Sequence, residues 1–326
     1  MQTVTLGHIG IDRRIARRGI VALLSAPLIL AALLALWWLT AFELLKAQIS
    51  QIGEHEKEQG RVWNCSDGIF GGFPFRIEAR CQTLTGVFES RSPAGISIPS
   101  VHVSASLFHP FRVCIQFGSP LKLTQNGHTS ISAQWRDVRA ELRTEFGFNP
   151  KQLSVTMDEL VINDFLSRGA MKLAHGEINI LPRFAPDGFS SGADVTASAD
   201  FLDFAGLGAP GYRANFEGRI DQAAALMKTN ALDQFQKSGG RFIVDHFSLK
   251  RPKQELYVSG HASLADDHRL DGSFKIHASG IGNLLGGIVF DPDMDRDDVE
   301  IRLPLVVSRG VMSVGPYPLG EVPPLY

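Results

Sequence analysis

The side chains that could do covalent chemistry in this sequence are three cysteines, Cys65, Cys81 and Cys114. The first two bracket the segment WNCSDGIFGGFPFRIEARC and lie 16 positions apart. In an oxidising compartment such a pair can form a disulfide, and closing a loop of that size is worth ~3 kcal/mol in the chain-entropy model. We therefore expect a Cys65–Cys81 bridge and a free thiol at Cys114. Pairing of either residue with Cys114 also fits the sequence.

A second candidate for chemistry is the acidic segment DPDMDRDD, from Asp291 to Asp298. Its carboxylates match positions one, three and five of a calcium-binding loop. However, Arg296 stands where that loop needs glycine, and Arg302 stands where it needs glutamate. A solvated acidic turn is the better interpretation, and calcium binding there stays open. The ten histidines are scattered without the spacing of metal ligands, so we expect neither a metal site nor a cofactor.

Motifs of nucleotide binding and hydrolysis are also weak. Gly206, Gly208 and Gly211 match a dinucleotide-binding pattern by letter, but the residues after them alternate like a strand, where that pattern requires a helix. The sequence contains no P-loop, nucleophile elbow or zinc-protease helix. A formal net charge of -2 gives no electrostatic footprint for nucleic acid. We expect no catalytic residues and no enzyme.

The elements that position these residues begin with a predicted membrane anchor. Residues 19–42 form an uncharged apolar run, which as a helix would span roughly 36 Å, enough to cross a hydrocarbon core of ~30 Å. Four arginines precede it and two tryptophans lie near its far end. The positive-inside rule then places residues 1–18 in the cytoplasm and the rest outside. A cleaved signal peptide is the alternative; the run is longer than a usual signal core, which favours an anchor.

A helical stalk is predicted over residues 43–62. Phe42, Leu45, Ile49 and Ile52 recur at helical spacing, so the anchor helix is expected to continue with one apolar side. We expect that side to pack on the chain's own domain. Export also explains the cysteines, because disulfides persist outside the cytosol.

From residue 63 to 326 we expect a mainly β (α+β) domain built as a long, curved antiparallel meander. Runs of alternating apolar and polar residues, separated by turn signals, predict strands with one apolar face. The predicted strands are Ile96–Leu107, Phe111–Phe117, Leu153–Met157, Glu177–Ile180, Val195–Phe201, Tyr212–Ile220, Arg241–Leu249, Glu255–Leu264, Ser273–Ala278 and Glu300–Val307.

One or two short helices are expected to cover this sheet. MDELVINDFLSR, residues 157–168, is a possible short helix, and residues 221–237 are the stronger candidate, with Asp221 as N-cap and Gly239–Gly240 as the stop. A hinge between two halves is predicted near residues 183–193. Ten to twelve strands make a sheet roughly 50 Å wide, whereas two helices cover perhaps 20 Å of it.

The remaining apolar face must either pack on itself or form a groove that a ligand fills. The residues that we predict to line such a groove share the apolar strand faces. They are Phe75, Ile77, Val113, Ile115, Phe117, Leu256, Val258, Phe274, Ile276, Leu303 and Leu305.

Three segments, together with the anchor, carry a resemblance to a known family. They are GIFGGFPFRIEARC at 68–81, SGGRFIVDHFSLKRPKQELYVSGHASL at 238–264 and RLPLVVSRGVMSVGPYPLGEVPPLY at 302–326. The chain resembles the alphaproteobacterial family "domain of unknown function 2125", whose members are membrane-anchored envelope proteins. More distantly, it is similar to AsmA-like periplasmic proteins, whose curved sheets are thought to shelter or guide lipids. The resemblance implies an inner-membrane anchor, a periplasmic domain and no enzyme.

The expected function is therefore binding or handling of an apolar envelope molecule such as lipid. The alternative is a structural or assembly factor that binds another envelope protein through an exposed strand edge. The identity of the ligand, the direction of transfer and the oligomeric state do not follow from the sequence.

Overall fold

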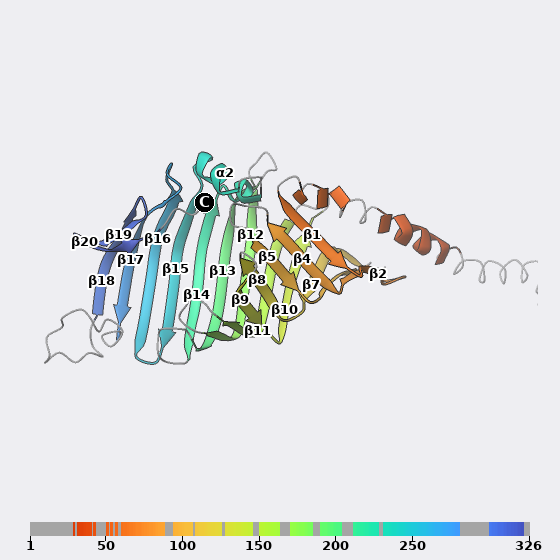
Figure 1. Ribbon diagram of the computed structural model, residues 1–326, viewed down its shortest axis with the longest axis horizontal. Coiled ribbons are helices and arrows are strands. Elements are labelled where there is room, and N and C mark those ends of the chain that lie inside the picture. The colour runs from red at the N-terminus through yellow and green to blue at the C-terminus, as the bar shows by residue number, and fades with distance from the viewer. Residues whose placement is uncertain are drawn as a thin grey trace, which may run out of the picture.

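A computed structural model shows the chain as one long, curved sheet with a helix at one end (Figure 1). The structure describes residues 29, 31–40, 42–43, 50–51, 53–54, 56–57, 60–88, 94–106, 108–125, 128–145, 150–163, 170–184, 190–203, 211–227, 231–280 and 300–322.

The described part of the chain forms a single antiparallel sheet of 20 strands. From β11 to β20, each strand pairs with the one that follows it in the sequence, which confirms the predicted meander. These strands are β11 (Pro150–Asn163), β12 (Met171–Phe184), β13 (Ser190–Asp203), β14 (Tyr212–Asp221), β15 (Arg241–Arg251), β16 (Gln254–Leu264), β17 (Leu270–Ser279), β18 (Glu300–Ser308), β19 (Val311–Val314) and β20 (Tyr317–Glu321).

The ten strands before β11 belong to the same meander, but here each long strand is bent in the middle. Strands β1 and β2, for example, are separated only by residues 67–68, and β1 pairs with β4 while β2 pairs with β3. These strands are β1 (Arg61–Ser66), β2 (Ile69–Gly71), β3 (Arg76–Cys81), β4 (Thr83–Phe88), β5 (Ala94–Ile98), β6 (Val101–Ser106), β7 (His109–Phe117), β8 (Leu121–Gln125), β9 (His128–Gln134) and β10 (Asp137–Thr144).

The bends divide this part of the sheet into two leaves. Leaf A contains β2, β3, β6, β7 and β10, and leaf B contains β1, β4, β5, β8 and β9. Both leaves rejoin at β11, which pairs with β10 along its first half and with β9 at its end. We call the residues at the bends the fold line; they are 67–68, 82, 99–100, 118–120 and 135–136.

The predicted helix at 157–168 is wrong, because residues up to Asn163 belong to β11; residues 164–169 lie outside the described part. Glu159 has a φ of 52° and has no partner in the pairing of β11 with β12. The register with β12 is the same on both sides of Glu159, yet Met157 and Leu160 pack in the same cluster although they are three apart. The irregular backbone at Glu159 thus imitates helical spacing within a strand.

The second predicted helix is partly confirmed. Asp221 still belongs to β14, a 3-10 turn covers Ala223–Met227, and α2 covers only Ala231–Lys237. Phe235 of α2 is 0 % exposed and packs against Ala225, Leu264 and their neighbours. The stop signal is confirmed: Gly239 has a φ of 70°, and the Gly240 N–H donates to the Phe235 carbonyl oxygen at 2.8 Å.

The N-terminal helix is described only in part, over residues 31–40 and 42–43 among others. In the described residues, no helix has both the length and the apolar character needed to cross a bilayer. Much of the predicted anchor, including residues 19–28, lies outside that part. The predicted hinge near 183–193 falls on the β12–β13 hairpin, whose residues 185–189 are likewise not described, so the hinge stays a prediction.

Candidate functional site: an apolar trough

One face of the sheet carries an unbroken row of apolar side chains. Residues directly opposite each other in paired strands point to the same face, so the register can be followed from strand to strand. The row crosses thirteen strands, from β2 to β18. Its members are Phe70, Ala79, Val103, Ile115, Ala140, Val155, Ile178, Ala197, Phe216, Phe247, Val258, Ile276 and Leu303.

Parallel rows flank it on the same face. One contains Leu142, Leu153, Ile180 and Val195, and another contains Ala214, Leu249, Leu256 and Ala278. Leaf B adds a row of its own, with Leu84, Ile98, Leu121 and Ala133. Ala133 of leaf B packs in one cluster with Met157 and Ala199 of β11 and β13, so the apolar side of leaf B joins the same face as the main rows. We call this concave apolar surface the trough.

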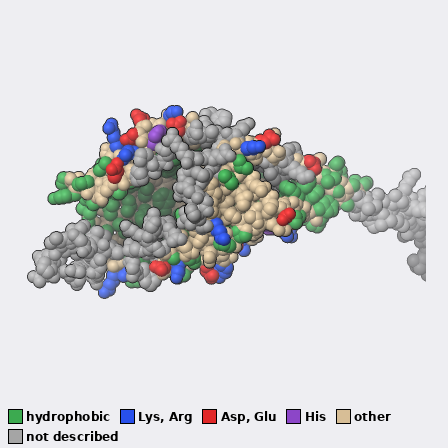
Figure 2. Space-filling model, in the orientation of Figure 1, with side chains coloured by type: hydrophobic (Ala, Val, Ile, Leu, Met, Phe, Trp, Pro, Cys, Tyr) green, Lys and Arg blue, Asp and Glu red, His purple; other side chains and the backbone are tan. Residues whose placement is uncertain are grey.

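Within the described part of the chain, no second layer of side chains fills the trough. Nearly all members of the long row are neither fully buried nor fully exposed, whereas the core side chains of a close-packed domain are buried. Among the described residues, the only large apolar side chain below 2 % exposure is Phe235, which lies under α2 at the rim. Figure 2 shows a hollow over the C-terminal strands whose visible floor is hydrophobic.

Three aromatic rings lie close to glycines of the sheet. A Cβ added to Gly218 would meet the Phe216 ring at 2.7 Å, and one added to Gly260 would meet the Phe274 ring at 2.7 Å. Trp63 lies over Gly86 in the same way, at 2.7 Å. The missing side chains leave room for the rings close to the sheet.

The opposite face of the sheet is polar and is laced by ion pairs between neighbouring strands. Arg213 and Asp200 approach to 2.7 Å, and Arg219 and Asp245 to 2.8 Å. His175 hydrogen-bonds to Asp158 at 2.8 Å, and this contact is the main reason why the pKa of Asp158 lies below its usual value. Charges on this side keep it in water, which leaves the trough as the apolar surface of the sheet.

Most of the predicted groove residues lie on the trough face. Phe75 is the exception: it lies in the turn before β3, 54 % exposed, and its ring stacks on Phe108. The register places the others either in the rows described or two positions from a row member on the same face. They are Ile77, Val113, Ile115, Phe117, Leu256, Val258, Phe274, Ile276, Leu303 and Leu305. Sequence reasoning missed leaf B and the middle of the long row, including Ala197 and Phe216, although both follow the same alternation.

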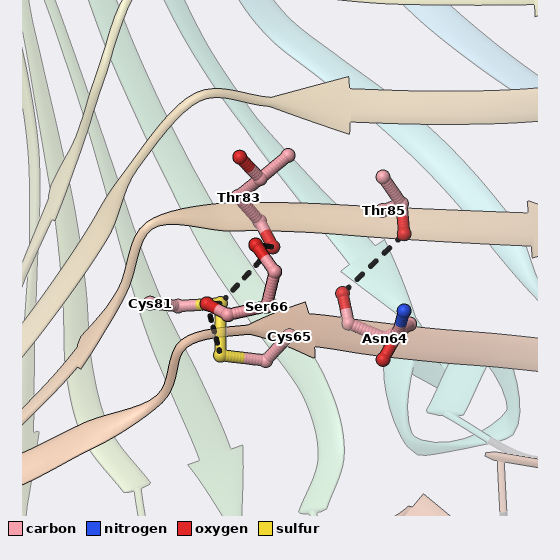
Figure 3. The surroundings of a disulfide bond; sticks show 6 residues. All are labelled: Asn64, Cys65, Ser66, Cys81, Thr83 and Thr85. Carbon is pink, nitrogen blue, oxygen red and sulfur yellow. Dashed lines mark hydrogen bonds between the residues drawn. A yellow bond between two sulfur atoms is a disulfide. The ribbon is translucent and has the colours of Figure 1, made fainter.

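The Cys65–Cys81 disulfide is confirmed, and Cys114 is the free thiol (Figure 3). The bridge joins β1 of leaf B to β3 of leaf A beside the fold line, where the Gln82 N–H also donates to the Ser66 carbonyl oxygen at 3.1 Å. Cys81 pairs with Val101, and its side chain lies on the trough face, two residues after Ala79. The bridge therefore ties the two walls of the trough together at the edge of the sheet.

A cluster of aromatic rings at the β2–β3 and β6–β7 turns was not predicted as a site. Trp38 of the N-terminal helix stacks on Phe42 with ring centroids 5.1 Å apart and meets the edge of Phe73 at 5.5 Å. Phe42 contacts Phe70, the first member of the long row, at 5.6 Å. The repeated phenylalanines of GGFPF were the available signal, but only the structure brings them to the end of the trough.

Within the described ranges, no group of three or more His, Cys, Asp or Glu side chains could hold a metal ion. The acidic segment 291–298 lies outside those ranges.

Comparison with known proteins gives one match. The model of a family described as "Uncharacterized protein conserved in bacteria (DUF2125)" matches residues 37–323. No curated protein and no solved structure matches the chain.

Proposed function

Because the chain belongs to the DUF2125 family of bacterial proteins, we propose that it is an envelope protein that binds an apolar molecule, a lipid, along the trough. The observation that carries the proposal is the long row of partly exposed apolar side chains opposite a charged face. Transfer of a hydrocarbon from water is worth ~0.8 kcal/mol for each methylene, so contact with apolar side chains alone can hold an acyl chain. No catalytic step is part of this function.

Membrane attachment through residues 19–42, and a location of the sheet outside the cytoplasm, are part of the same proposal. The uncharged run and its arginine flank support them, and so does the disulfide, because such bonds persist in oxidising compartments. An anchored trough would take its ligand from, or deliver it to, the membrane that holds it.

A matched pair of substitutions tests ligand binding. Ala197→Trp places a large ring in the middle of the long row, whereas Ser198→Trp places the same ring on the polar face, one residue away in β13. The full chain is purified in a mild detergent, and bound lipid is measured by native mass spectrometry and by extraction. We expect lipid on the wild type and on Ser198→Trp, and at least a several-fold loss on Ala197→Trp. Wild-type protein free of lipid would refute the proposal.

The alternative, an assembly factor that binds another envelope protein, is favoured by one observation. In the last described strand, β20, all five residues are exposed, with Tyr317 at 73 % and Leu319 at 63 %. An exposed strand edge can take up a strand of a partner. Crosslinking in cells separates the two functions: a single protein captured at β20, with no lipid in the trough, would favour the assembly factor.

A further inference from the structure

The trough opens at one end onto an exposed aromatic surface. We call this surface the aromatic tip; it consists of Phe70, Phe73 and Phe75 at the β2–β3 turn and Phe108 and Phe111 at the β6–β7 turn. The two turns are neighbours because β3 pairs with β6, and Phe75 stacks on Phe108 with centroids 5.9 Å apart. Phe108 is 70 % exposed and Phe73 is 56 % exposed. Rings so exposed leave much of their apolar surface in contact with water.

The charge around the aromatic tip is positive. Residues 69–76 and 108–112 contain no acidic side chain, whereas Arg76 and Arg112 are both present. These two arginines and His109 line a hollow of about 450 Å³ directly beside Phe75 and Phe108. Glu78 and Glu141 contact the arginines from the neighbouring strand positions, so the hollow is only moderately basic. Apolar rings next to guanidinium groups suit the boundary between acyl chains and lipid phosphates.

The N-terminal helix of residues 31–40 contacts the aromatic tip. The Trp38 indole N–H donates to the Arg76 carbonyl oxygen at 3.0 Å, which fixes the helix of residues 31–40 against the aromatic tip. The part of the chain that precedes this helix and lies outside the described residues includes the uncharged stretch 19–28. Residues 31–40, which follow that stretch in the sequence, therefore lead into the fold beside the aromatic tip, and indoles such as Trp37 and Trp38 favour the membrane interface.

We propose that the aromatic tip inserts into the interfacial layer of a lipid bilayer, with Arg76 and Arg112 at the level of the phosphates. Phe70 belongs both to the aromatic tip and to the long row, so that row of the trough begins at the aromatic tip. This inference rests on the proposed function, because it supplies the entrance through which a lipid reaches the trough without crossing water.

The test measures depth in the membrane. Single cysteines carrying a nitroxide label replace Phe75 or Phe108 in a Cys114→Ser background, in which the remaining cysteines are bridged. The full chain is reconstituted into vesicles of phosphatidylethanolamine and phosphatidylglycerol. Collision rates of the label with oxygen, which dissolves in lipid, and with a water-soluble nickel complex report its depth. Ser198→Cys on the polar face and Leu319→Cys at the far edge serve as controls.

We expect the ratio of oxygen to nickel collisions to be several-fold higher at positions 75 and 108 than at 198 and 319. Labels at 75 and 108 that match the one at 198 would overturn the proposal. A label at 319 as deep as those at the aromatic tip would also overturn it, because the sheet would then lie flat on the membrane. Vesicles of phosphatidylcholine alone should reduce the depth, since they remove the anionic headgroups that the arginines attract.

A second set of variants distinguishes membrane insertion of the aromatic tip from lipid binding in the trough. Phe75→Ser with Phe108→Ser should lower the collision ratio of a label at position 111 several-fold, whereas Tyr317→Ser with Leu319→Ser should leave it unchanged. Both pairs of side chains are exposed, so folding is not at risk, and protection of Cys65 and Cys81 from thiol reagents confirms it. Bound lipid is measured on the same samples. If lipid is bound but the labels at the aromatic tip remain in water, membrane insertion is refuted and lipid binding is not. If the aromatic tip is inserted but no lipid is bound, the proposed function is refuted and membrane insertion is not.

Discussion

Glu141 shows, at the scale of single residues, how the polar face of the sheet is held together. Its carboxylate contacts Arg112 of the neighbouring strand β7 and Arg143 of its own strand, the latter at 2.7 Å. Partial burial raises the pKa of Glu141, but hydrogen bonds and charge from the two arginines outweigh it, so the pKa lies below its usual value. Both arginines are more than half exposed, so water screens the interaction.

We predict that Glu141→Gln lowers the free energy of unfolding by about 0.5–1 kcal/mol at neutral pH. A carboxyl group whose pKa is lowered in the folded state stabilises the fold above its unfolded pKa of about 4.3. That contribution is lost as the pH falls through the lower folded pKa. In urea unfolding, the difference in free energy of unfolding between the wild type and Glu141→Gln should therefore be constant from about pH 5 to 7 and should vanish below about pH 4.

The control is Glu159→Gln, because the Glu159–Arg136 pair is well exposed on both sides. This variant should unfold within about 0.5 kcal/mol of the wild type at every pH. If Glu141→Gln lowers the free energy of unfolding by the same amount in acid, the loss is caused by packing and not by charge.

At the scale of elements, α2 packs against one end of the sheet mainly through Phe235, its one fully buried side chain. Phe235 lies 4.7 Å from Phe242 between ring centroids and is completely buried. A Cβ at Gly240 would meet that ring at 2.4 Å, so glycine there permits the close approach of helix and sheet.

We predict that Phe235→Ala destabilises the protein by about 3–5 kcal/mol, because it leaves a cavity between α2 and the sheet. Gln234→Ala, at an exposed position of the same helix, should change stability by less than about 0.5 kcal/mol. Both are measured by urea unfolding of the full chain, followed by tryptophan fluorescence. Equal effects of the two substitutions would show that α2 does not pack on the sheet in solution.

The strands were largely predictable, because alternation of side chains is a local property of the sequence. The prediction Tyr212–Ile220, for example, agrees with β14 at Tyr212–Asp221 to within one residue. The bends are not predicted: the sequence pattern indicates a single strand over Ile96–Leu107, whereas residues 99–100 separate β5 from β6. The signal was present, since the apolar residues change from even positions (Ile96, Ile98) to odd ones (Val101, Val103) at that point.

At the scale of the whole molecule, the register gives the trough its length. Thirteen strands spaced ~4.8 Å apart extend over roughly 58 Å, about twice the ~30 Å hydrocarbon core of a bilayer. The sequence predicted that the apolar face of the sheet is wider than the helices can cover. It could not predict which strands face one another across the fold line, because such contacts depend on bends and on pairings far apart in the chain.

The proposed location predicts the outcome of a labelling experiment. In cells with an intact inner membrane, a membrane-impermeant maleimide should modify Ser198→Cys in a Cys114→Ser background, because Ser198 is exposed on the polar face. Cys65 and Cys81 should react only after reduction. Labelling of position 198 only after the cells are lysed would place the sheet in the cytoplasm and contradict the proposal.

The rings that rest on Gly218 and Gly260 have a consequence for movement. A hydrocarbon lying along a row of apolar side chains meets a similar environment from strand to strand. Sliding would then be possible in both directions, and net flow would be set by supply and removal at the two ends. A Cβ at Gly218 would lie 2.5 Å from the Ile243 carbonyl oxygen and 2.7 Å from the Phe216 ring, so Gly218→Ala would force both to shift and would disturb the row at this point.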